Sequence, residues 1–280
     1  MSAAQTFWID GHRATSLPLP DRGLDFGDGL FETLLGVNGR VPFLALHMDR
    51  LTRGLKVLGF PDVTDLAHKY LNMALSELDS EARAIRLTVT RGSALRGYAP
   101  PQEASPRIII SVSPLAWNPL RPASPAELGV ADIRWSNQPV LAGIKHLNRL
   151  EQVLAAGQRV AQGWDEAVML DDEGLPLSVV SGNLFIVKDA RLLTPPLERC
   201  GIAGTRRALI VERWQDQLGL EVKVERFTLA ELEAATEVFY CNSLLGFQPV
   251  GIFGSTSWTS QAVCSSVQKL YMEAIQCGDC

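Results

Sequence analysis

Apolar residues recur along the chain in two rhythms, one typical of strands and one typical of helices. Apolar and polar positions alternate, as in a half-buried strand, at Ile85, Leu87 and Val89. A short apolar run over 108–112 indicates a buried strand. Helical spacing appears at Leu44, Met48, Leu51, Leu55 and Leu58. Together with a second helical stretch over 62–78, these patterns predict alternating strands and helices in the first 113 residues.

A tight turn is indicated at Asn38-Gly39, because both residue types tolerate the positive φ of a type I′ turn. The flanking stretches, 30–37 and 40–43, contain apolar residues suited to strands. The sequence therefore predicts a β-hairpin over these residues.

Prolines gather between Pro114 and Pro125, and because proline fixes φ and lacks an N–H, this stretch is the best linker candidate. Strands and helices resume after it. Strands are predicted at 129–135, 166–170, 175–180, 183–187, 221–227 and 237–241, and helices at 146–162, 205–218 and 260–275. The capping-box pattern Thr228 to Glu231 predicts a short helix as well. We predict two α/β (α+β) domains: a small N-terminal one over 1–116, a linker over 117–126 and a larger one over 127–280.

Composition excludes several classes of protein. The 280 residues carry a formal net charge of −5 and are 46% hydrophobic, which argues against a nucleic-acid-binding protein with its basic face. No apolar run reaches the roughly 18 residues of a membrane-spanning helix, and the N-terminal residues lack a signal-peptide pattern. The four histidines show no metal-ligand spacing. We therefore expect a cytoplasmic protein without a metal site or a membrane partner.

One lysine stands apart from the other five. Lys145 follows the apolar run 140–144 at the point where a helix is predicted to begin, whereas the others occupy positions typical of solvated surface. A nucleophilic amine must be desolvated to lose its proton near neutral pH. Its spacing alone favours a different interpretation, a lysine that snorkels to solvent at a helix start.

A phosphate group is best held by N–H donors at a helix N-terminus. The segment Gly201-Ile-Ala-Gly204-Thr205-Arg206 offers two glycines, a hydroxyl and a predicted helix start. Asn242-Ser243, after the strand predicted at 237–241, would add further donors. Neither segment is specific by itself, since glycine-rich loops before helices are mostly structural.

Several short motifs in a fixed order raise the specificity. The chain resembles the class IV pyridoxal-phosphate enzymes, which share fold type IV, and within them the lyase branch that acts on 4-amino-4-deoxychorismate. The matching segments run almost from end to end, at 8–11, 21–33, 47–51, 91–98, 141–152, 182–185, 201–206 and 241–242. The stretch 142–152, together with Arg-Gly-Tyr at 96–98, points to the lyase branch.

The resemblance implies roles for individual residues. Lys145 would be the catalytic lysine that carries the cofactor, pyridoxal 5′-phosphate. The other cofactor-binding residues implied are Arg50, Ser178, Ile202, Ala203, Thr205, Asn242 and Ser243. Candidates for contacts with an anionic substrate are Arg96, Tyr98, Arg22 and Arg149. The family is homodimeric, so the resemblance also implies a homodimer with its active site at the domain and subunit interface; for Arg96 and Tyr98, an ordinary surface turn is the alternative.

One position departs from the family pattern. Where the family normally has a glutamate that keeps the cofactor's ring nitrogen protonated, counting back from Asn183 gives Ser178. A carboxylate there makes the ring a strong electron sink, which transamination needs and an aromatising elimination needs less. A slip in this count would make Glu173 the missing carboxylate, although Glu173 precedes the turn glycine.

The expected activity is therefore elimination of pyruvate from 4-amino-4-deoxychorismate to give 4-aminobenzoate for folate biosynthesis. The alternatives are a class IV aminotransferase for branched-chain or D-amino acids, and a catalytically altered paralogue that binds the cofactor. A non-enzymatic scaffold would bind no cofactor at all.

Overall fold

The computed structural model describes residues 5–78, 81–94, 96–119, 121 and 124–277, and its chain divides into two compact units. The described residues up to Asn118, together with Ile144–Asn148, form the first unit. Pro119–Gly143 and the described residues from Arg149 onward form the second. The sequence predicts 144–148 within the larger domain, whereas these five residues cluster with the first unit.

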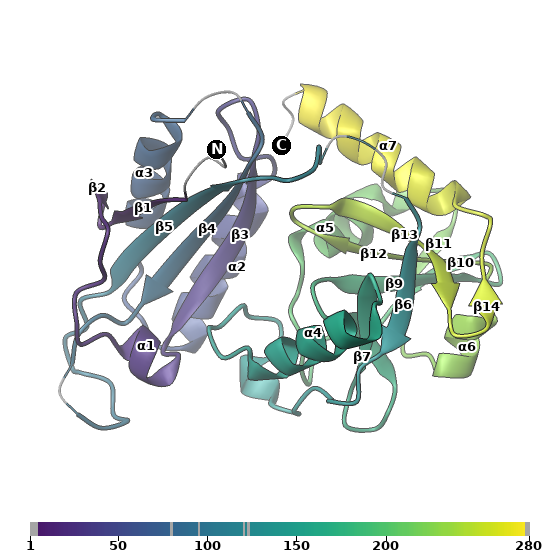
Figure 1. Ribbon diagram of the computed structural model, residues 1–280, viewed down its shortest axis with the longest axis horizontal. Helices are drawn as coiled ribbons and strands as arrows, with labels where there is room; N and C mark the ends of the chain where they lie inside the picture. Colours follow the sequence, from purple (N-terminus) through teal and green to yellow (C-terminus); the bar gives the residue numbers. More distant parts are fainter. Residues whose placement is uncertain (1–4, 79–80, 95, 120, 122–123, 278–280) are drawn as a thin grey trace. The chain divides into compact units, whose positions relative to one another are not determined.

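The first unit is built on an antiparallel sheet that has five strands in the described part of the chain, in the order β2-β1-β5-β4-β3 (Figure 1). The strands are β1 (Thr6–Ile9), β2 (His12–Arg13), β3 (Gly29–Gly36), β4 (Arg83–Thr90) and β5 (Arg107–Pro114). The helices are α1 (Arg22–Phe26), α2 (Leu44–Val57) and α3 (Thr64–Leu75). Helix α2 packs on β3, and α3 packs on β4 and β5.

The predicted alternation in β4 is confirmed. Ile85, Leu87 and Val89 are buried, and Arg86 between them is exposed. The helical spacing of α2 likewise buries Leu51 and Leu55. Burial of such a side chain stabilises the fold by about 1.5–3 kcal/mol, so this face of the sheet carries much of the unit's stability.

The predicted hairpin is only half right. Asn38 and Gly39 have φ of 52° and 72°, and they form the expected turn, closed by one bridge between Val37 and Arg40. The second strand is wrong, because residues after Arg40 lead within four positions into α2. Strand β3 pairs instead with β4.

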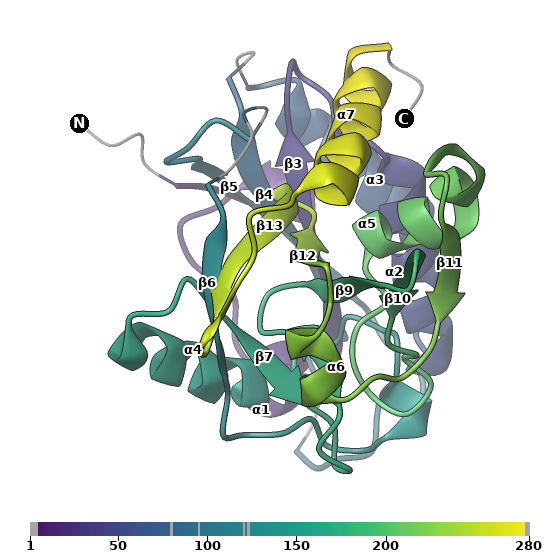
Figure 2. The same cartoon turned by 90° about the vertical axis from the view of Figure 1, so that its right-hand side faces the viewer.

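The second unit contains a mixed sheet in the order β11-β10-β9-β12-β13-β6-β7-β8, with β14 paired to β13. Its strands are β6 (Ala126–Val130), β7 (Glu166–Leu170), β8 (Pro176–Val179), β9 (Asn183–Lys188), β10 (Arg191–Thr194), β11 (Glu221–Val224), β12 (Glu237–Asn242), β13 (Gly246–Phe253) and β14 (Thr256–Ser257). Its helical elements are η1 (Pro139–Leu141), α4 (Leu150–Gln162), α5 (Thr205–Ala208), η2 (Leu209–Trp214), η3 (Gln215–Gln217), α6 (Leu229–Glu233) and α7 (Ala262–Cys277). Figure 2 shows β12 and β13 side by side, as their antiparallel pairing requires.

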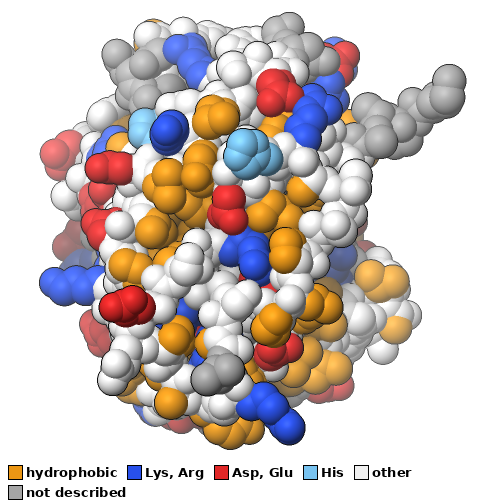
Figure 3. Space-filling view, turned by 90° about the vertical axis from the view of Figure 1, so that its left-hand side faces the viewer, with side chains coloured by type: hydrophobic (Ala, Val, Ile, Leu, Met, Phe, Trp, Pro, Cys, Tyr) orange, Lys and Arg blue, Asp and Glu red, His pale blue; other side chains and the backbone are white. Residues whose placement is uncertain are grey.

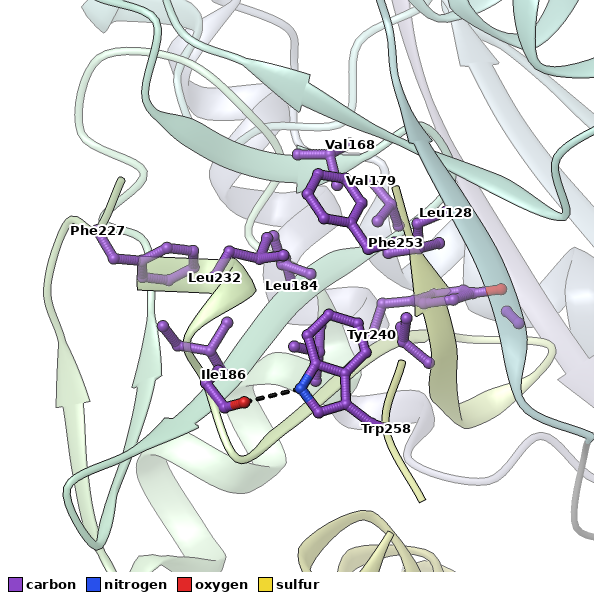
Figure 4. Packing of buried hydrophobic residues seen from close by; sticks show 14 of the residues in the cluster. Leu128, Val168, Val179, Leu184, Ile186, Phe227, Leu232, Tyr240, Phe253 and Trp258 are labelled. Carbon is purple, nitrogen blue, oxygen red and sulfur yellow. Dashed lines mark hydrogen bonds between the residues drawn. The ribbon is translucent and has the colours of Figure 1, made fainter. Parts of the chain in front are cut away.

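A hydrophobic cluster fills one side of this sheet. Figure 4 shows its aromatic members, Phe227, Tyr240, Phe253 and Trp258, among aliphatic side chains such as Leu184 and Val168. The indole Nε1 of Trp258 donates to the carbonyl of Ala235 at 2.7 Å. This hydrogen bond satisfies the cluster's buried indole donor, so the tryptophan is buried without an unpaired polar atom.

Some predicted boundaries shift in the second unit. The strand predicted at 129–135 lies earlier, at β6, and strand β13 is absent from the prediction. The capping box is confirmed, because Thr228 Oγ1 accepts from Glu231 N while Glu231 accepts from Thr228 N. The helix predicted over 205–218 is present as α5, η2 and η3 in succession.

The distribution of charged side chains on the surface agrees with the modest net charge. On the face in Figure 3, acidic and basic side chains are interspersed and do not gather into a patch of one sign. Within the described residues, no helix combines the length and the apolar character needed to cross a bilayer.

Candidate functional site

Lys145 lies in an extended segment of the first unit that runs beside β3. Its carbonyl accepts from Phe31 N at 2.9 Å, and Leu147 N donates to the carbonyl of Gly29 at 3.0 Å. The ammonium Nζ lies 4.4 Å from the centroid of the Phe31 ring. Because two backbone hydrogen bonds fix this segment, the position of Lys145 depends on β3.

The predicted helix start at Lys145 is wrong. Helix α4 begins at Leu150, five residues later, because the backbone of 145–147 is already paired with β3. Gly29 makes this pairing possible: a Cβ there would lie 2.4 Å from the carbonyl of Val89 and 2.8 Å from the Leu147 side chain. Gly29, the second glycine of the motif Phe26-Gly27-Asp28-Gly29, is therefore needed for close approach of two chain segments.

In the second unit, the 201–204 loop is held by two glycines and an asparagine. Gly143 N donates to the carbonyl of Gly201, and Ala203 N donates to the carbonyl of Gly143, both at 3.0 Å. Asn183 Nδ2 donates to the carbonyl of Ile202 at 3.0 Å. Gly143 thus anchors the loop, and it precedes Lys145 by two residues in the sequence.

The loop ends where a helical stretch begins, as the sequence predicts. Gly204 precedes Thr205, the first residue of α5, and Thr205 is buried. The guanidinium of Arg206, 1% exposed, lies 3.4 Å from Thr205 Oγ1 and 3.3 Å from the carbonyl of Ser243. A helix N-terminus, a hydroxyl and a buried cation together form a donor set that suits a phosphate group.

The close packing at Gly204 supports this interpretation. A Cβ at Gly204 would lie 2.0 Å from Asn183 Oδ1, so any larger residue would displace the asparagine that holds the loop. Asn242 completes the neighbourhood: its Oδ1 accepts from the N–H groups of Leu244 and Leu245, which shapes the turn that contains Ser243. The residues present therefore fit a phosphorylated cofactor.

Arg50, the predicted phosphate contact, belongs to a buried charged cluster in the first unit. Its Nε donates to Glu32 Oε1 at 2.8 Å, and His47 Nδ1 donates to Glu32 Oε2 at 2.7 Å. Burial raises the pKa of Glu32, but the charge and hydrogen bond of Arg50 and those of His47 outweigh it and lower the pKa to about 2. Glu32 therefore stays ionised and orients the arginine.

Ser178, predicted at the position of the family glutamate, lies on β8 and is buried. Trp135 Nε1 donates to Ser178 Oγ at 2.9 Å. The guanidinium carbon of Arg149 lies 5.6 Å from the centroid of the Trp135 ring. Burial lowers the pKa of Arg149 to about 10, with Glu151 opposing the shift, so Arg149 remains protonated at neutral pH. A hydroxyl, an indole and a cation thus occupy this part of the second unit.

Glu173, the alternative to Ser178, is bound elsewhere. It is exposed and forms ion pairs with Arg199 and Arg226. These two hydrogen bonds lower the pKa of its carboxyl. A carboxylate held by two surface arginines is not available to replace the family glutamate.

Arg22, a predicted substrate contact, is buried and holds a turn of the first unit. Its guanidinium donates to the carbonyls of Gly97, Tyr98 and Ala99 and to Asp28 Oδ2. Tyr98 itself is 86% exposed, and its ring lies 5.4 Å from that of Phe26. Arg22 therefore fixes the turn from which Arg96 and Tyr98 project.

The predicted site residues fall into two groups. The first unit contains Arg22, Arg50, Arg96, Tyr98 and Lys145. The second contains Arg149, Ser178, Ile202, Ala203, Thr205, Asn242 and Ser243. Sequence reasoning missed the supporting residues Glu32, Trp135, Asn183 and Arg206. Asn183, Arg206 and Glu32 lie inside the matched motifs, although the motif assigned Glu32 no role, and Trp135 lies outside them.

Known proteins resemble this chain over nearly its whole length. The family model described as Amino-transferase class IV matches residues 29–252. Aminodeoxychorismate lyase from Vibrio harveyi is 37% identical over 252 residues, covering 87% of this chain and 90% of the relative. A putative branched-chain-amino-acid aminotransferase from Methanocaldococcus jannaschii is 32% identical over 234 residues, covering 82% and 80%.

A solved structure agrees with these relatives. The crystal structure of 4-amino-4-deoxychorismate lyase from Pseudomonas aeruginosa matches with a TM-score of 0.87 at 39% identity, covering 95% of this chain and 98% of that one. The predicted two-domain fold of type IV is confirmed. The chain belongs to the class IV aminotransferase family.

Proposed function

We propose that this chain is a pyridoxal-phosphate-dependent aminodeoxychorismate lyase, which eliminates pyruvate from 4-amino-4-deoxychorismate to give 4-aminobenzoate for folate biosynthesis. The observation that carries the proposal is the likeness to two such lyases, at 37% and 39% identity, over almost the whole chain. The serine at position 178 supports it, because an aromatising elimination needs a weaker electron sink than transamination does.

The residues proposed to hold the cofactor are the following. Its phosphate would be held by the 201–204 loop, Thr205 and Ser243, beside the guanidinium of Arg206, which donates to Thr205 Oγ1 and to the carbonyl of Ser243. Arg50 adds a second cation, oriented by Glu32. When bound, pyridoxal phosphate withdraws electrons from the carbon that carries the substrate's amine and so acidifies the proton on that carbon.

Lys145 is the proton-transfer group. With the cofactor and substrate bound, the amine of Lys145 would remove the proton from C4 of the substrate as a general base. The bond between C3 and the enolpyruvyl oxygen breaks, and the departing fragment takes up one proton to become pyruvate. The proton removed from C4 balances the proton gained, so Lys145 can deliver the same proton, and the ring becomes aromatic.

The substrate carries two carboxylates, which arginines suit because their planar fork matches a carboxylate. Arg96 and Arg149 are the proposed contacts, with Tyr98 beside Arg96. Arg22 is the weakest of the four candidates, because its guanidinium already holds the carbonyls of residues 97–99 and Asp28. It acts by fixing the turn.

The second candidate function is a class IV aminotransferase, favoured by the likeness to the putative branched-chain-amino-acid aminotransferase at 32% identity. Such an enzyme would convert its cofactor to the amine form in a half-reaction with an amino acid. The two functions differ in product, since only the lyase releases pyruvate from aminodeoxychorismate.

The assembly and the location are further parts of the proposal. We propose that the protein acts as a cytoplasmic homodimer with its active site at the domain and subunit interface, and that the turn 96–98 of one copy borders the other copy's site. The high exposure of Tyr98 in the single chain is compatible with burial against a second copy. The mass of the protein in solution, measured by light scattering, tests the dimer.

One experiment tests the function. The purified protein is saturated with pyridoxal phosphate, aminodeoxychorismate is supplied, and pyruvate is followed with a coupled assay. We expect pyruvate release that falls by about 100- to 10,000-fold or more in Lys145→Ala, the range attributed to a general base. Lys188→Ala is the control, because Lys188 lies on the surface and pairs with Glu231. No pyruvate from the cofactor-bound protein would rule out the lyase.

A further inference from the structure

The hydrogen-bonding state of Ser178 has a consequence for the chemistry of the cofactor. Trp135 Nε1 is a donor only, so Ser178 Oγ must be the acceptor of their 2.9 Å hydrogen bond. Within the described residues, this is the one hydrogen bond recorded for the Ser178 hydroxyl. Its own hydrogen is therefore left to donate to whatever lies next to it.

We propose that Ser178, positioned by Trp135, donates a hydrogen bond to the ring nitrogen of the bound cofactor and keeps that nitrogen unprotonated. This inference rests on the proposed function, and on the position of Ser178 at the family glutamate. A neutral ring nitrogen accepts the hydroxyl hydrogen. A protonated one would present a second donor and leave the hydroxyl hydrogen unpaired in a buried site, which is costly.

The charges around Ser178 also favour an unprotonated ring nitrogen. Arg149 lies over the Trp135 ring and is cationic at neutral pH. A nearby positive charge disfavours a second cation. Glu151 contributes a negative charge, but its carboxylate interacts with the charge of Arg149 and accepts a hydrogen bond from the N–H of Ser136. Cys200, in the same cluster as Trp135, has its pKa raised by burial to about 11 and is neutral.

No relocated carboxylate replaces the missing glutamate among the described residues of the second unit. Its buried carboxylates are Glu166, Asp171 and Glu237. Glu166 accepts from Ser181, and Glu237 accepts from the N–H groups of Val263 and Cys264 at the start of α7. Asp171 accepts within its own turn. Each is committed to a structural contact that does not involve Ser178.

A neutral ring nitrogen narrows the reactions available to the site. A neutral ring would stabilise the electron pair at C4 less strongly. The site therefore favours reactions in which that pair is used at once to expel a leaving group. Loss of the enolpyruvyl oxygen with aromatisation meets this condition. Transamination, which requires the pair to be stored and reprotonated elsewhere, is disfavoured. Ser178 is thus a specificity-determining residue.

The test measures the ring nitrogen directly. Protein loaded with cofactor labelled with ¹⁵N at the ring nitrogen is studied by NMR at neutral pH. We expect a neutral, pyridine-like signal for the wild type. Ser178→Glu introduces an opposite charge, which shifts a pKa by about 1–3 units and so changes the ratio of protonated to neutral nitrogen by about 10- to 1,000-fold. Ser178→Gln is the matched control of the same size without the charge and should keep the neutral signal.

Two further readouts separate positioning from simple structural support. Ser178→Ala should weaken cofactor binding by about two- to tenfold, the effect of one lost hydrogen bond. Ser178→Glu, but not Ser178→Gln, should gain a transamination half-reaction, seen as conversion of the cofactor spectrum on adding an amino acid. If Ser178→Glu does not fold, the wild-type and Ser178→Gln spectra still decide the question.

The outcomes distinguish this inference from the proposed function. A protonated signal in the wild type overturns the inference even if pyruvate is released. A neutral signal in a cofactor-bound protein that releases no pyruvate overturns the proposed lyase activity and leaves the inference standing. Failure to bind the cofactor overturns both.

Discussion

The buried cluster of Glu32, His47 and Arg50 allows a quantitative prediction. Glu32 is 1% exposed, and its pKa is about 2 in the folded protein against a reference value of 4.5. A difference of about 2.5 units at 1.36 kcal/mol per unit corresponds to about 3 kcal/mol of folding stability. Because the folded pKa is lowered, this contribution is complete above pH 4.5 and is lost as the pH falls from about 4.5 to about 2.

The perturbation is Glu32→Gln, which leaves the guanidinium of Arg50 buried beside a neutral amide. Loss of one partner from a buried ion pair costs about 3–5 kcal/mol. We expect the free energy of unfolding, from urea denaturation followed by circular dichroism, to fall by about 3 kcal/mol at pH 7. The difference between wild type and variant should shrink as the pH falls below 4.5.

Glu231→Gln provides the comparison. The pKa of Glu231 is also lowered to about 2, by hydrogen bonds from Lys188 and from Thr228, but its side chain is 39% exposed. Solvent screens an exposed pair, so this variant should lose at most about 1 kcal/mol. If Glu32→Gln costs no more than Glu231→Gln and keeps the wild-type pH dependence, the assignment of stability to the buried cluster is refuted.

Three further outcomes are expected elsewhere in the chain. Arg22→Ala removes the donors to Gly97, Tyr98 and Ala99, so trypsin should cleave after Arg96 several-fold faster; an unchanged rate would contradict the anchoring of this turn. Gly204→Ala should weaken cofactor binding by about tenfold or more in equilibrium dialysis, since its Cβ would meet Asn183 Oδ1 at 2.0 Å, whereas Gly157→Ala, with nothing within 4 Å, should not. Burial raises the pKa of Cys241 to about 12, so iodoacetamide at pH 7.5 should modify exposed Cys277 and leave Cys241 intact by peptide mass spectrometry; equal labelling would disagree with that burial.

Local patterns predicted the regular elements well because their cause is local. The alternation of Ile85, Leu87 and Val89 places all three on the buried face of β4, and the helical spacing of Leu51 and Leu55 places both against β3. The capping box at Thr228 was predicted for the same reason, since its two hydrogen bonds join residues three apart.

Elements whose state depends on distant partners were mispredicted. The sequence predicts a helix start at residues 145–147, but their backbone groups form hydrogen bonds with β3, which lies more than 100 positions earlier. Residues 40–43 read as a strand, but only one bridge forms before α2 begins, since β4 pairs along the whole of β3. In both cases tertiary pairing overrides the local preference.

In the candidate site, too, features with a local cause could be predicted and those that depend on distant partners could not. The glycines of the 201–204 loop could be picked out, because glycines before a helix start allow close backbone approach, and Gly29 could be picked out as part of the matched segment 21–33. Glu32 could not, because a glutamate in an apolar strand is interpretable only beside the arginine 18 residues later that it orients. A single sequence without homologues does not record that pairing.

Position 178 shows why the chemistry of a site has to be inferred from the sequence and the structure together. From the sequence, Ser178 is only a missing carboxylate, and a missing group predicts a weaker cofactor without saying in which state the ring nitrogen is held. In the structure, Trp135, 43 residues away, donates to Ser178 Oγ. The hydroxyl hydrogen of Ser178 is therefore left to donate to the ring nitrogen. A donor selects the neutral nitrogen, whereas an absent partner would select neither form. The same substitution therefore changes from a loss of electron withdrawal into a positive preference for elimination. The ¹⁵N signal followed against pH separates the two: with Ser178→Ala the ring nitrogen should become protonated at a higher pH than in the wild type, where the hydroxyl donates to it, whereas identical titrations would make the serine only a missing carboxylate.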